Sequence, residues 1–303
     1  MDWLEIAVPA APGDVEAVAD VLRRYAPTGV AIEEPLLSHG DSVSIDADSP
    51  ALVKVYLRQG DHLPSQRRAL RRDLSHLNLS VPLPPLRGRW VRDEDWAESW
   101  KQHFHVERIG KRLVVRPRWR EYHPQPGDVV INIDPGMAFG TGQHATTHMC
   151  LLALEKYVFA GCHLLDLGTG SGILAIAAAE LGAGHVLALD IDALATSVAH
   201  HNVEANAVND RVRVTLGSLA EYWPLATPYQ AAFDIVVANI NASTIIEMAR
   251  PLVEALKKGG VGIAGGIIEE RFDSCRDALE EAGAAIIDVM TGGEWRTIIF
   301  EAR

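Results

Sequence analysis

The chain has little cysteine and no long apolar run. Its 303 residues include three cysteines, Cys150, Cys162 and Cys275, and no C-x-x-C motif. Scattered single cysteines indicate buried, reduced thiols in a reducing compartment. No apolar run approaches the roughly 18 residues of a membrane span, and acidic residues follow Met1 closely, which is not typical of a signal peptide. We therefore expect a cytoplasmic protein without a membrane partner.

Positive charge is also scarce. The chain has 28 Lys and Arg against 40 Asp and Glu, a formal net charge of −12. This balance argues against non-specific binding to nucleic acid. Four arginines do gather in a helical pattern over residues 64–77, but we interpret them as a solvated helix face. Apolar residues make up 48% of the chain, which is ample for a large α/β core.

Three glycines at every second position follow a short apolar run in the middle of the chain. Residues 164–167 precede Gly168, Gly170 and Gly172, an Ala-rich helical pattern follows, and a second apolar run ends at Asp190. This order predicts a strand, a tight turn, a helix and a parallel strand, half of a nucleotide-binding unit. The glycines let the backbone approach a ligand, and the helix N-terminus favours an anionic group. Asp190 is placed to accept hydrogen bonds from a ribose diol.

The spacing of these glycines separates two kinds of ligand. Ile173 stands where the dinucleotide fingerprint G-x-G-x-x-G has its third glycine, which leaves an NAD-dependent oxidoreductase as a weak alternative. The pattern Asp166-x-Gly168-x-Gly170-x-Gly172 is similar to motif I of class I methyltransferases, which use S-adenosylmethionine (AdoMet). The methionine carboxylate would then lie at the helix N-terminus. A glycine-rich turn without a ligand is the remaining alternative.

The N-terminal part predicts a small α+β domain. Its order, βαββαβ, is that of a ferredoxin-like fold. Expected strands cover residues 3–8, 29–34, 51–57 and 87–91, and expected helices begin after Pro12 and cover 64–77.

The domain organisation follows from this pattern. We expect residues 107–303 to form a domain that the likeness to motif I indicates to be an AdoMet-dependent methyltransferase domain. Residues 1–92 contain no cofactor motif and are expected to form a substrate-recognition domain. Residues 93–106 are expected to form a helical linker, in which Trp96 and Trp100 share one face.

The C-terminal part predicts a Rossmann-like sheet. Apolar strands alternate with helical patterns, which indicates seven mostly parallel strands with helices on both faces. Short strands are expected over 111–119 and 128–133, ahead of the sheet. The expected strands of the sheet cover about 163–167, 187–190, 211–216, 234–240, 261–264, 285–289 and 295–300. The expected helices cover about 148–159, 173–181, 193–205, 242–256 and 268–282.

A glycine-rich stretch, residues 134–147, precedes motif I. Its glycines would let it cover the ligand as a lid, although a structural Ω-loop is the alternative. We expect its closing pair, Thr146 and Thr147, to cap a helix that begins near His148.

Asn239 ends the fourth apolar strand and offers both a donor and an acceptor. Ligands of doubly wound sheets bind at the carboxyl ends of the strands, so Gly168, Asp190 and Asn239 are expected to meet at one cleft. The Asn-Pro-Pro-Tyr of DNA adenine and glutamine-amide methyltransferases is missing, because Ile240 follows the asparagine. Those two classes are therefore disfavoured.

Together these stretches resemble the ribosomal protein L-11 methyltransferases of the PrmA type. The resemblance runs from about residue 93 to the C-terminus, and the glycine-rich loop is its most specific part. The matching segments are Asp95-Trp96-x-x-x-Trp100-Lys101, Val114-Val115-Arg116-Pro117-x-Trp119, Asp134-Pro135-Gly136-x-Ala138-Phe139-Gly140-Thr141-Gly142-x-His144-x-Thr146-Thr147, motif I, Ala238-Asn239-Ile240-x-Ala242 and Glu294-Trp295.

The resemblance implies AdoMet as methyl donor and lysine side-chain and α-amino groups of ribosomal protein L-11 as acceptors. It carries the AdoMet-binding role over to Thr147, Gly168, Asp190 and Asn239, with Gly170 in the same turn. Neither nucleic acid nor a membrane is required as a partner. Lysine methylation of another protein and a non-catalytic AdoMet-binding module are the alternatives.

Methyl transfer to an amine places one demand on the site. A protonated lysine has no lone pair, so its pKa, ordinarily near 10.4, must fall or its proton must be lost in a desolvated cleft. Asn239 and His144 are the candidate catalytic residues, and for His144 we favour a role in fixing the loop. Asp190-x-Asp192 and the nearby histidines match no standard metal spacing, so no metal is expected.

Overall fold

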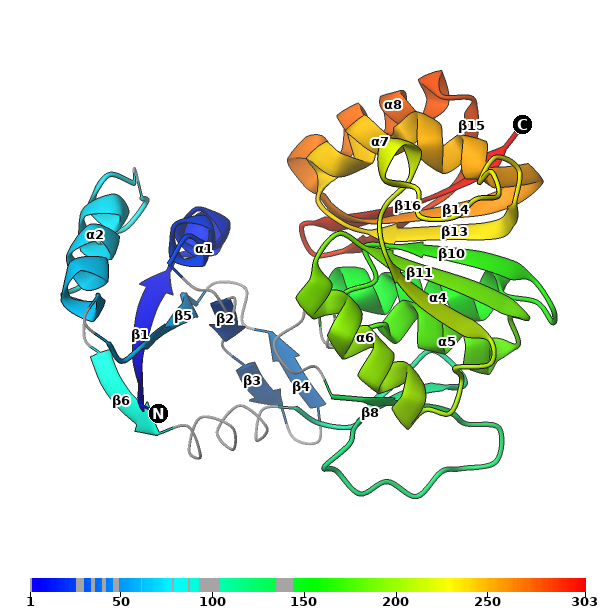
Figure 1. The fold of residues 1–303 in the computed structure, drawn as a ribbon. Coiled ribbons are helices and arrows are strands. Elements are labelled where there is room, and N and C mark those ends of the chain that lie inside the picture. The colour runs from blue at the N-terminus through cyan, green and yellow to red at the C-terminus, as the bar shows by residue number, and fades with distance from the viewer. Residues whose placement is uncertain are drawn as a thin grey trace. The chain divides into compact units, whose positions relative to one another are not determined.

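A computed structural model of the protein separates into two compact units, residues 1–104 and 105–303 (Figure 1). Most of the expected linker, residues 93–103, and residues 135–143 of the glycine-rich loop lie outside the described residues. No helix in the described part is long and apolar enough to cross a membrane. The structure describes residues 2–25, 30–33, 36–39, 42–45, 49–60, 62–77, 79–86, 88–92, 104–134 and 144–303.

The first unit contains a four-stranded antiparallel sheet in the order β2-β5-β1-β6. This order confirms the predicted ferredoxin-like arrangement. A short hairpin, β3–β4, is inserted between the second and third expected strands and was not predicted. The elements are β1 (Asp2–Ala10), α1 (Val15–Arg23), β2 (Val30–Glu33), β3 (Leu36–His39), β4 (Ser42–Ile45), β5 (Ala51–Arg58), α2 (Leu63–Ser75) and β6 (Gly88–Arg92).

One face of this sheet is covered by both helices. Along β5 the side chains of Ala51, Val53, Val55 and Leu57 are buried, and the residues between them are not. This alternation is that of a strand with one face on the core. The buried residues of α1 and α2 belong to the same apolar cluster as Val53, Val55 and Leu57 of β5.

The second unit contains a seven-stranded sheet in the order β12-β11-β10-β13-β14-β16-β15. Neighbouring strands are parallel except at β16, which runs antiparallel to both β14 and β15. This confirms the predicted Rossmann-like sheet. The strands are β10 (His163–Leu167), β11 (His185–Asp190), β12 (Val212–Leu216), β13 (Phe233–Asn239), β14 (Leu256–Ile268), β15 (Ala284–Gly292) and β16 (Trp295–Ala302).

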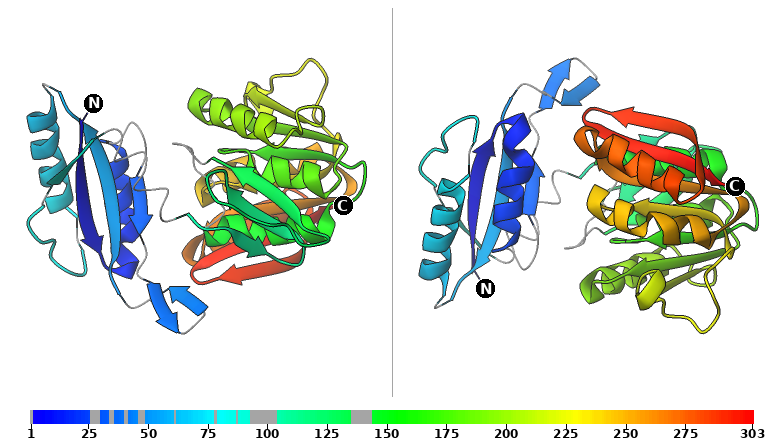
Figure 2. Two further views of the ribbon diagram at one scale, coloured as in Figure 1. Left: turned by 90° about the horizontal axis from the view of Figure 1, so that it is seen from below. Right: turned by 90° about the horizontal axis from the view of Figure 1, so that it is seen from above.

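Helices cover both faces of this sheet (Figures 1 and 2). Most buried apolar residues of α4, α5 and α6 belong to one apolar cluster, and the buried residues of α7 and α8 belong to another. Strands buried between two such layers have to be apolar on both sides, as β10 and β13 are. The helices are α4 (Ala145–Tyr157), α5 (Ile173–Leu181), α6 (Ala193–Ala205), α7 (Ala242–Ala255) and α8 (Phe272–Glu281).

The second unit begins with a small three-stranded sheet in the order β7-β8-β9. Its strands are β7 (Glu107–Ile109), β8 (Leu113–Pro117) and β9 (Val129–Ile133), of which β7 was not predicted. Glu155 of α4 fixes the turn between β7 and β8, because its carboxylate accepts the backbone N–H groups of Lys111, Arg112 and Leu113 at 2.9, 2.5 and 3.2 Å. Three such bonds tie the small sheet to the helix that enters the site.

The start of α4 differs from the prediction. The helix begins at Ala145 and not near His148, and the threonine pair lies inside its first turn. Its N-cap is His144, whose Nδ1 accepts the backbone N–H of Thr146 at 3.3 Å. The histidine therefore takes the capping role that the sequence assigned to the threonines.

Candidate functional site

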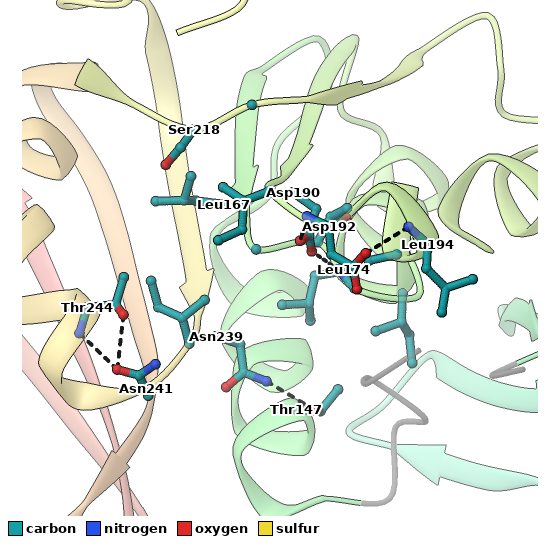
Figure 3. A pocket seen from close by; sticks show the side chains of 18 residues that line it. Thr147, Leu167, Leu174, Asp190, Asp192, Leu194, Ser218, Asn239, Asn241 and Thr244 are labelled. Carbon is teal, nitrogen blue, oxygen red and sulfur yellow. Dashed lines mark hydrogen bonds between the residues drawn. The ribbon is translucent and has the colours of Figure 1, made fainter. Parts of the chain in front are cut away.

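A cleft of about 430 Å³ opens where β10, β11 and β13 end (Figure 3). The sheet order reverses between β10 and β13, and such a switch point is where doubly wound sheets bind ligands. Five of the predicted site residues come together there. The lining residues are Thr147, Leu167, Gly168, Thr169, Gly170, Ile173, Leu174, Asp190, Ile191, Asp192, Leu194, Ala195, Gly217, Ser218, Asn239, Ile240, Asn241 and Thr244.

The glycine turn between β10 and α5 forms the floor of the cleft. Gly168, Gly170 and Gly172 all have positive φ angles, of 74°, 54° and 84°, which side chains disfavour. Packing adds a second reason at two of them. A Cβ on Gly168 would lie 2.4 Å from Cγ2 of Ile240, and one on Gly172 would lie 3.3 Å from Ala199 of α6. The fold itself therefore requires these glycines.

Asp190 closes the turn from the neighbouring strand. Its Oδ2 accepts the N–H of Gly170 at 2.9 Å, and its Oδ1 accepts the N–H of Asp192 at 3.0 Å. A carboxylate has about four acceptor positions, so these two bonds leave capacity for a diol. Asp190 lines the cleft at the carboxyl end of β11 (Figure 3), where the ribose interpretation requires it.

Asn239 and Thr147 meet across the cleft wall. Nδ2 of Asn239, at the end of β13, donates to Oγ1 of Thr147 in the first turn of α4, at 3.1 Å (Figure 3). The paired residue on β14 is Gly265, where a Cβ would lie 3.0 Å from Oδ1 of Asn239. The asparagine is therefore held in place by one side-chain hydrogen bond and by close packing against a strand that has no side chain there.

His144 does not line the cleft. Its Nδ1 lies 2.8 Å from Oγ1 of Thr146, and its ring meets the ring of Trp295 edge-on with centroids 4.8 Å apart. These contacts fix the first turn of α4 and, through it, Thr147. The geometry gives no support to a role of His144 as a base in the cleft, and its predicted role in fixing the loop stays a prediction, since residues 135–143 lie outside the described residues.

Asp166, the acid of motif I, lies beneath the turn and not in the cleft. It is fully buried. Its Oδ2 accepts hydrogen bonds from the hydroxyl of Thr169 at 2.6 Å and from the N–H of Ala175 at 3.1 Å. Its Oδ1 has no hydrogen-bond partner among the described residues. Burial raises the pKa of this carboxyl to about 7, and the charge of Asp190 adds a smaller rise. Its position links the end of β10 to the start of α5.

Several lining residues were missed by the sequence reasoning. Ile191 follows Asp190 and lines the cleft, and its side chain is 77% exposed although it is apolar. Leu194 lies near it and is also exposed. Asn241 caps α7 by accepting the N–H of Thr244 at 2.9 Å. The available signal was position, since Ile191 and Asn241 lie within two residues of the ends of β11 and β13, and Leu194 lies in the first turn of α6.

The lining residues fit AdoMet. The volume lies within the range of about 300–1,000 Å³ that is usual for ligand pockets. Asp190 offers an acceptor for a ribose diol, Ile191 and Leu194 offer apolar surface for a base, and the N-terminus of α5 offers N–H groups for a carboxylate. Among the described residues, no group of three or more His, Cys, Asp or Glu side chains is arranged to hold a metal.

Comparisons with known proteins agree with this fit. The family model described as ribosomal protein L11 methyltransferase (PrmA) matches residues 2–303. A ribosomal protein L11 methyltransferase of Chloroflexus aurantiacus is 42% identical, over 98% of this chain and 97% of its own. One of Pelotomaculum thermopropionicum is 43% identical, over 97% of each chain. The crystal structure of a ribosomal protein L11 methylase from Lactobacillus delbrueckii subsp. bulgaricus matches with a TM-score of 0.60 and 32% identity, over 66% of this chain and 100% of that chain.

Proposed function

The chain belongs to the ribosomal protein L11 methyltransferase family, and on this premise we propose that it transfers methyl groups from AdoMet to lysine side chains and the α-amino group of ribosomal protein L11. The observation that carries the proposal is the family match over residues 2–303 together with a cleft in which Gly168, Gly170, Asp190 and Asn239 meet. AdoMet, when bound, supplies an electrophilic methyl group on a sulfonium.

We assign the residues that bind AdoMet to separate parts of the ligand. Asp190 accepts the ribose hydroxyls, and its bond to Gly170 keeps the turn close enough for backbone N–H groups to reach the methionine part. Ile191 covers one face of the adenine. Such positioning is the main task of an enzyme whose reaction is an in-line displacement.

The acceptor amine is oriented from the wall of the cleft. Asn239 is held by Thr147, so its amide stands in a fixed direction at the end of β13. A fixed amide can accept a hydrogen bond from the amine and direct its lone pair. The lysine loses its proton on leaving water, because burial beside a cation lowers the pKa of an amine. His144 acts at a distance, as the cap that positions Thr147.

We propose a division of labour between the two parts of the chain. Residues 1–92 recognise the ribosomal protein, residues 107–303 bind AdoMet and carry the chemistry, and residues 93–106 link them. The proposal is supported by the location of every cleft residue in the second unit. We further propose that the enzyme acts in the cytoplasm and needs neither nucleic acid nor a membrane as a partner, because its proposed substrate is a ribosomal protein.

Incubation of the purified protein with isotope-labelled AdoMet and purified L11 tests the proposed function. Mass spectrometry should find label on lysine side chains and the N-terminus of L11. A cell extract in which label appears on a different protein, with none on L11, would favour the alternative lysine methyltransferase. Tight AdoMet binding without transfer to any protein would favour the non-catalytic module.

A further inference from the structure

Two asparagines one turn apart, Asn202 in the last turn of α6 and Asn206 at its C-cap, bind the backbone of β9 and of the residue that follows it. Oδ1 of Asn206 accepts the N–H of Asn132 and its Nδ2 donates to the carbonyl of the same residue, both at 2.7 Å. Oδ1 of Asn202 accepts the N–H of Asp134 and its Nδ2 donates to that carbonyl, both at 3.0 Å. Bonding to both groups of alternate residues is the pattern of a neighbouring strand. The two side chains thus replace a strand at this edge.

The two asparagines differ in their third hydrogen bond. Nδ2 of Asn202 also donates to the carbonyl of Ser171 at 2.9 Å, whereas Nδ2 of Asn206 donates to the carbonyl of Asn202 within the helix at 2.7 Å. Ser171 stands in the glycine turn, between Gly170 and Gly172, and is fully buried together with Asn202. Only one of the pair therefore reaches the floor of the cleft.

Helix α6 also contacts the same turn by packing. A Cβ on Gly172 would lie 3.3 Å from the Cα and Cβ of Ala199, which is three residues before Asn202. The turn is thus held against α6 by a close contact and a buried hydrogen bond. Loss of a buried hydrogen bond of this kind is destabilising, because the carbonyl does not recover a water in its place.

We propose that Asn202 is a positioning residue for AdoMet binding: its side-chain amide holds the glycine turn in the shape that accepts the ligand. The inference rests on the proposed function, since it concerns the same cleft. Asn202 does not line the cleft and acts through Ser171. Its replacement should therefore raise the Kd and the KM for AdoMet more than it lowers kcat, because the acceptor-facing wall at Asn239 is on another strand.

The structure provides a matched control in Asn206. Each side chain makes three hydrogen bonds to backbone groups, and both support β9, but only Asn202 contacts the turn. We expect Asn202→Ala to raise the Kd for AdoMet about tenfold in calorimetry and Asn206→Ala to change it less than about twofold. An equal loss of affinity in both variants would overturn the proposal, and so would unchanged affinity in Asn202→Ala. Failure of the unaltered protein to bind AdoMet would instead refute the proposed function.

Hydrogen exchange of the unaltered protein tests the positioning role of Asn202 without a substitution, and it therefore also applies if Asn202→Ala does not fold. Ligand binding that tightens the turn must also tighten the groups bonded to Asn202, because coupling is reciprocal. In hydrogen exchange of the unaltered protein, AdoMet should slow exchange of the Asp134 N–H, which Asn202 accepts, and leave the Asn132 N–H, which Asn206 accepts, nearly unchanged. Equal slowing at both amides, or none at Asp134, would contradict the proposal.

Discussion

As pH rises, the free energy of unfolding should fall in the unaltered protein because Asp166 ionises, and the Asp166→Asn variant should not show this fall. Burial raises the pKa of Asp166 to about 7 in the folded state, whereas an unfolded aspartate titrates near 3.9. Folding therefore favours the protonated carboxyl, and this contribution to stability is complete below about pH 4 and is lost as pH rises toward 7. Three pKa units correspond to about 4 kcal/mol, of which about 3 kcal/mol falls between pH 5 and pH 8.

The substitution is close to isosteric. The amide oxygen of an asparagine can accept from Thr169 and Ala175 as Oδ2 of Asp166 does, and the amide cannot ionise. Urea unfolding of both proteins should be measured at several pH values between 5 and 8, so that the titration of all shared carboxyl groups cancels in the difference. The variant should gain stability relative to the unaltered protein as pH rises. A difference that stays constant over this range would show that Asp166 is ionised when folded and would refute the reasoning from burial.

Four further predictions concern the cleft and its support. Asp190→Ala should weaken AdoMet binding by about 1–3 kcal/mol in calorimetry, and unchanged affinity would remove the ribose assignment. Asn239→Ala should lose most methyl transfer in single-turnover assays with its circular dichroism spectrum retained; normal turnover would make Asn239 a structural residue. Glu155→Gln should lower Tm by several degrees, because one oxygen cannot accept three N–H groups in the observed arrangement. Deletion of residues 1–104 should leave AdoMet affinity nearly intact while L11 methylation collapses, and full-rate methylation by the truncated protein would refute the recognition role.

The core of the second unit was predictable because its signals are local. The apolar run before Gly168 and the run that ends at Asp190 each predict a buried strand, and parallel strands place their carboxyl ends at one edge of the sheet. Asn239 could therefore be placed beside them without any knowledge of side-chain contacts. The observed cleft brings the three together as this topology requires.

The parts that could not be predicted depend on contacts between distant segments. Local propensity favours Thr146 and Thr147 as helix caps, but the edge-on contact of His144 with Trp295 belongs to the tertiary structure. The spacing of Asn202 from Ala195 and Ala199 puts it on the buried face of α6, but a polar side chain there gives no sign of the partner that it bonds. That partner is the backbone just after β9, which no local pattern reveals.

Residues around the glycine turn differ in whether folding or ligand binding explains their presence. Asp166 holds the turn from below, Asp190 holds it from the neighbouring strand, and Asn202 holds it from α6. The positive φ angles of its glycines, and the packing of Gly168 on Ile240 and of Gly172 on Ala199, would require glycine even in a protein that binds nothing, so motif I alone cannot establish a function. Ile191 is different, because folding gives no reason for an apolar side chain that is 77% exposed beside Asp190. Because the exposed Leu194 lines the same cleft, the two apolar side chains support the proposed adenine site better than the glycines do.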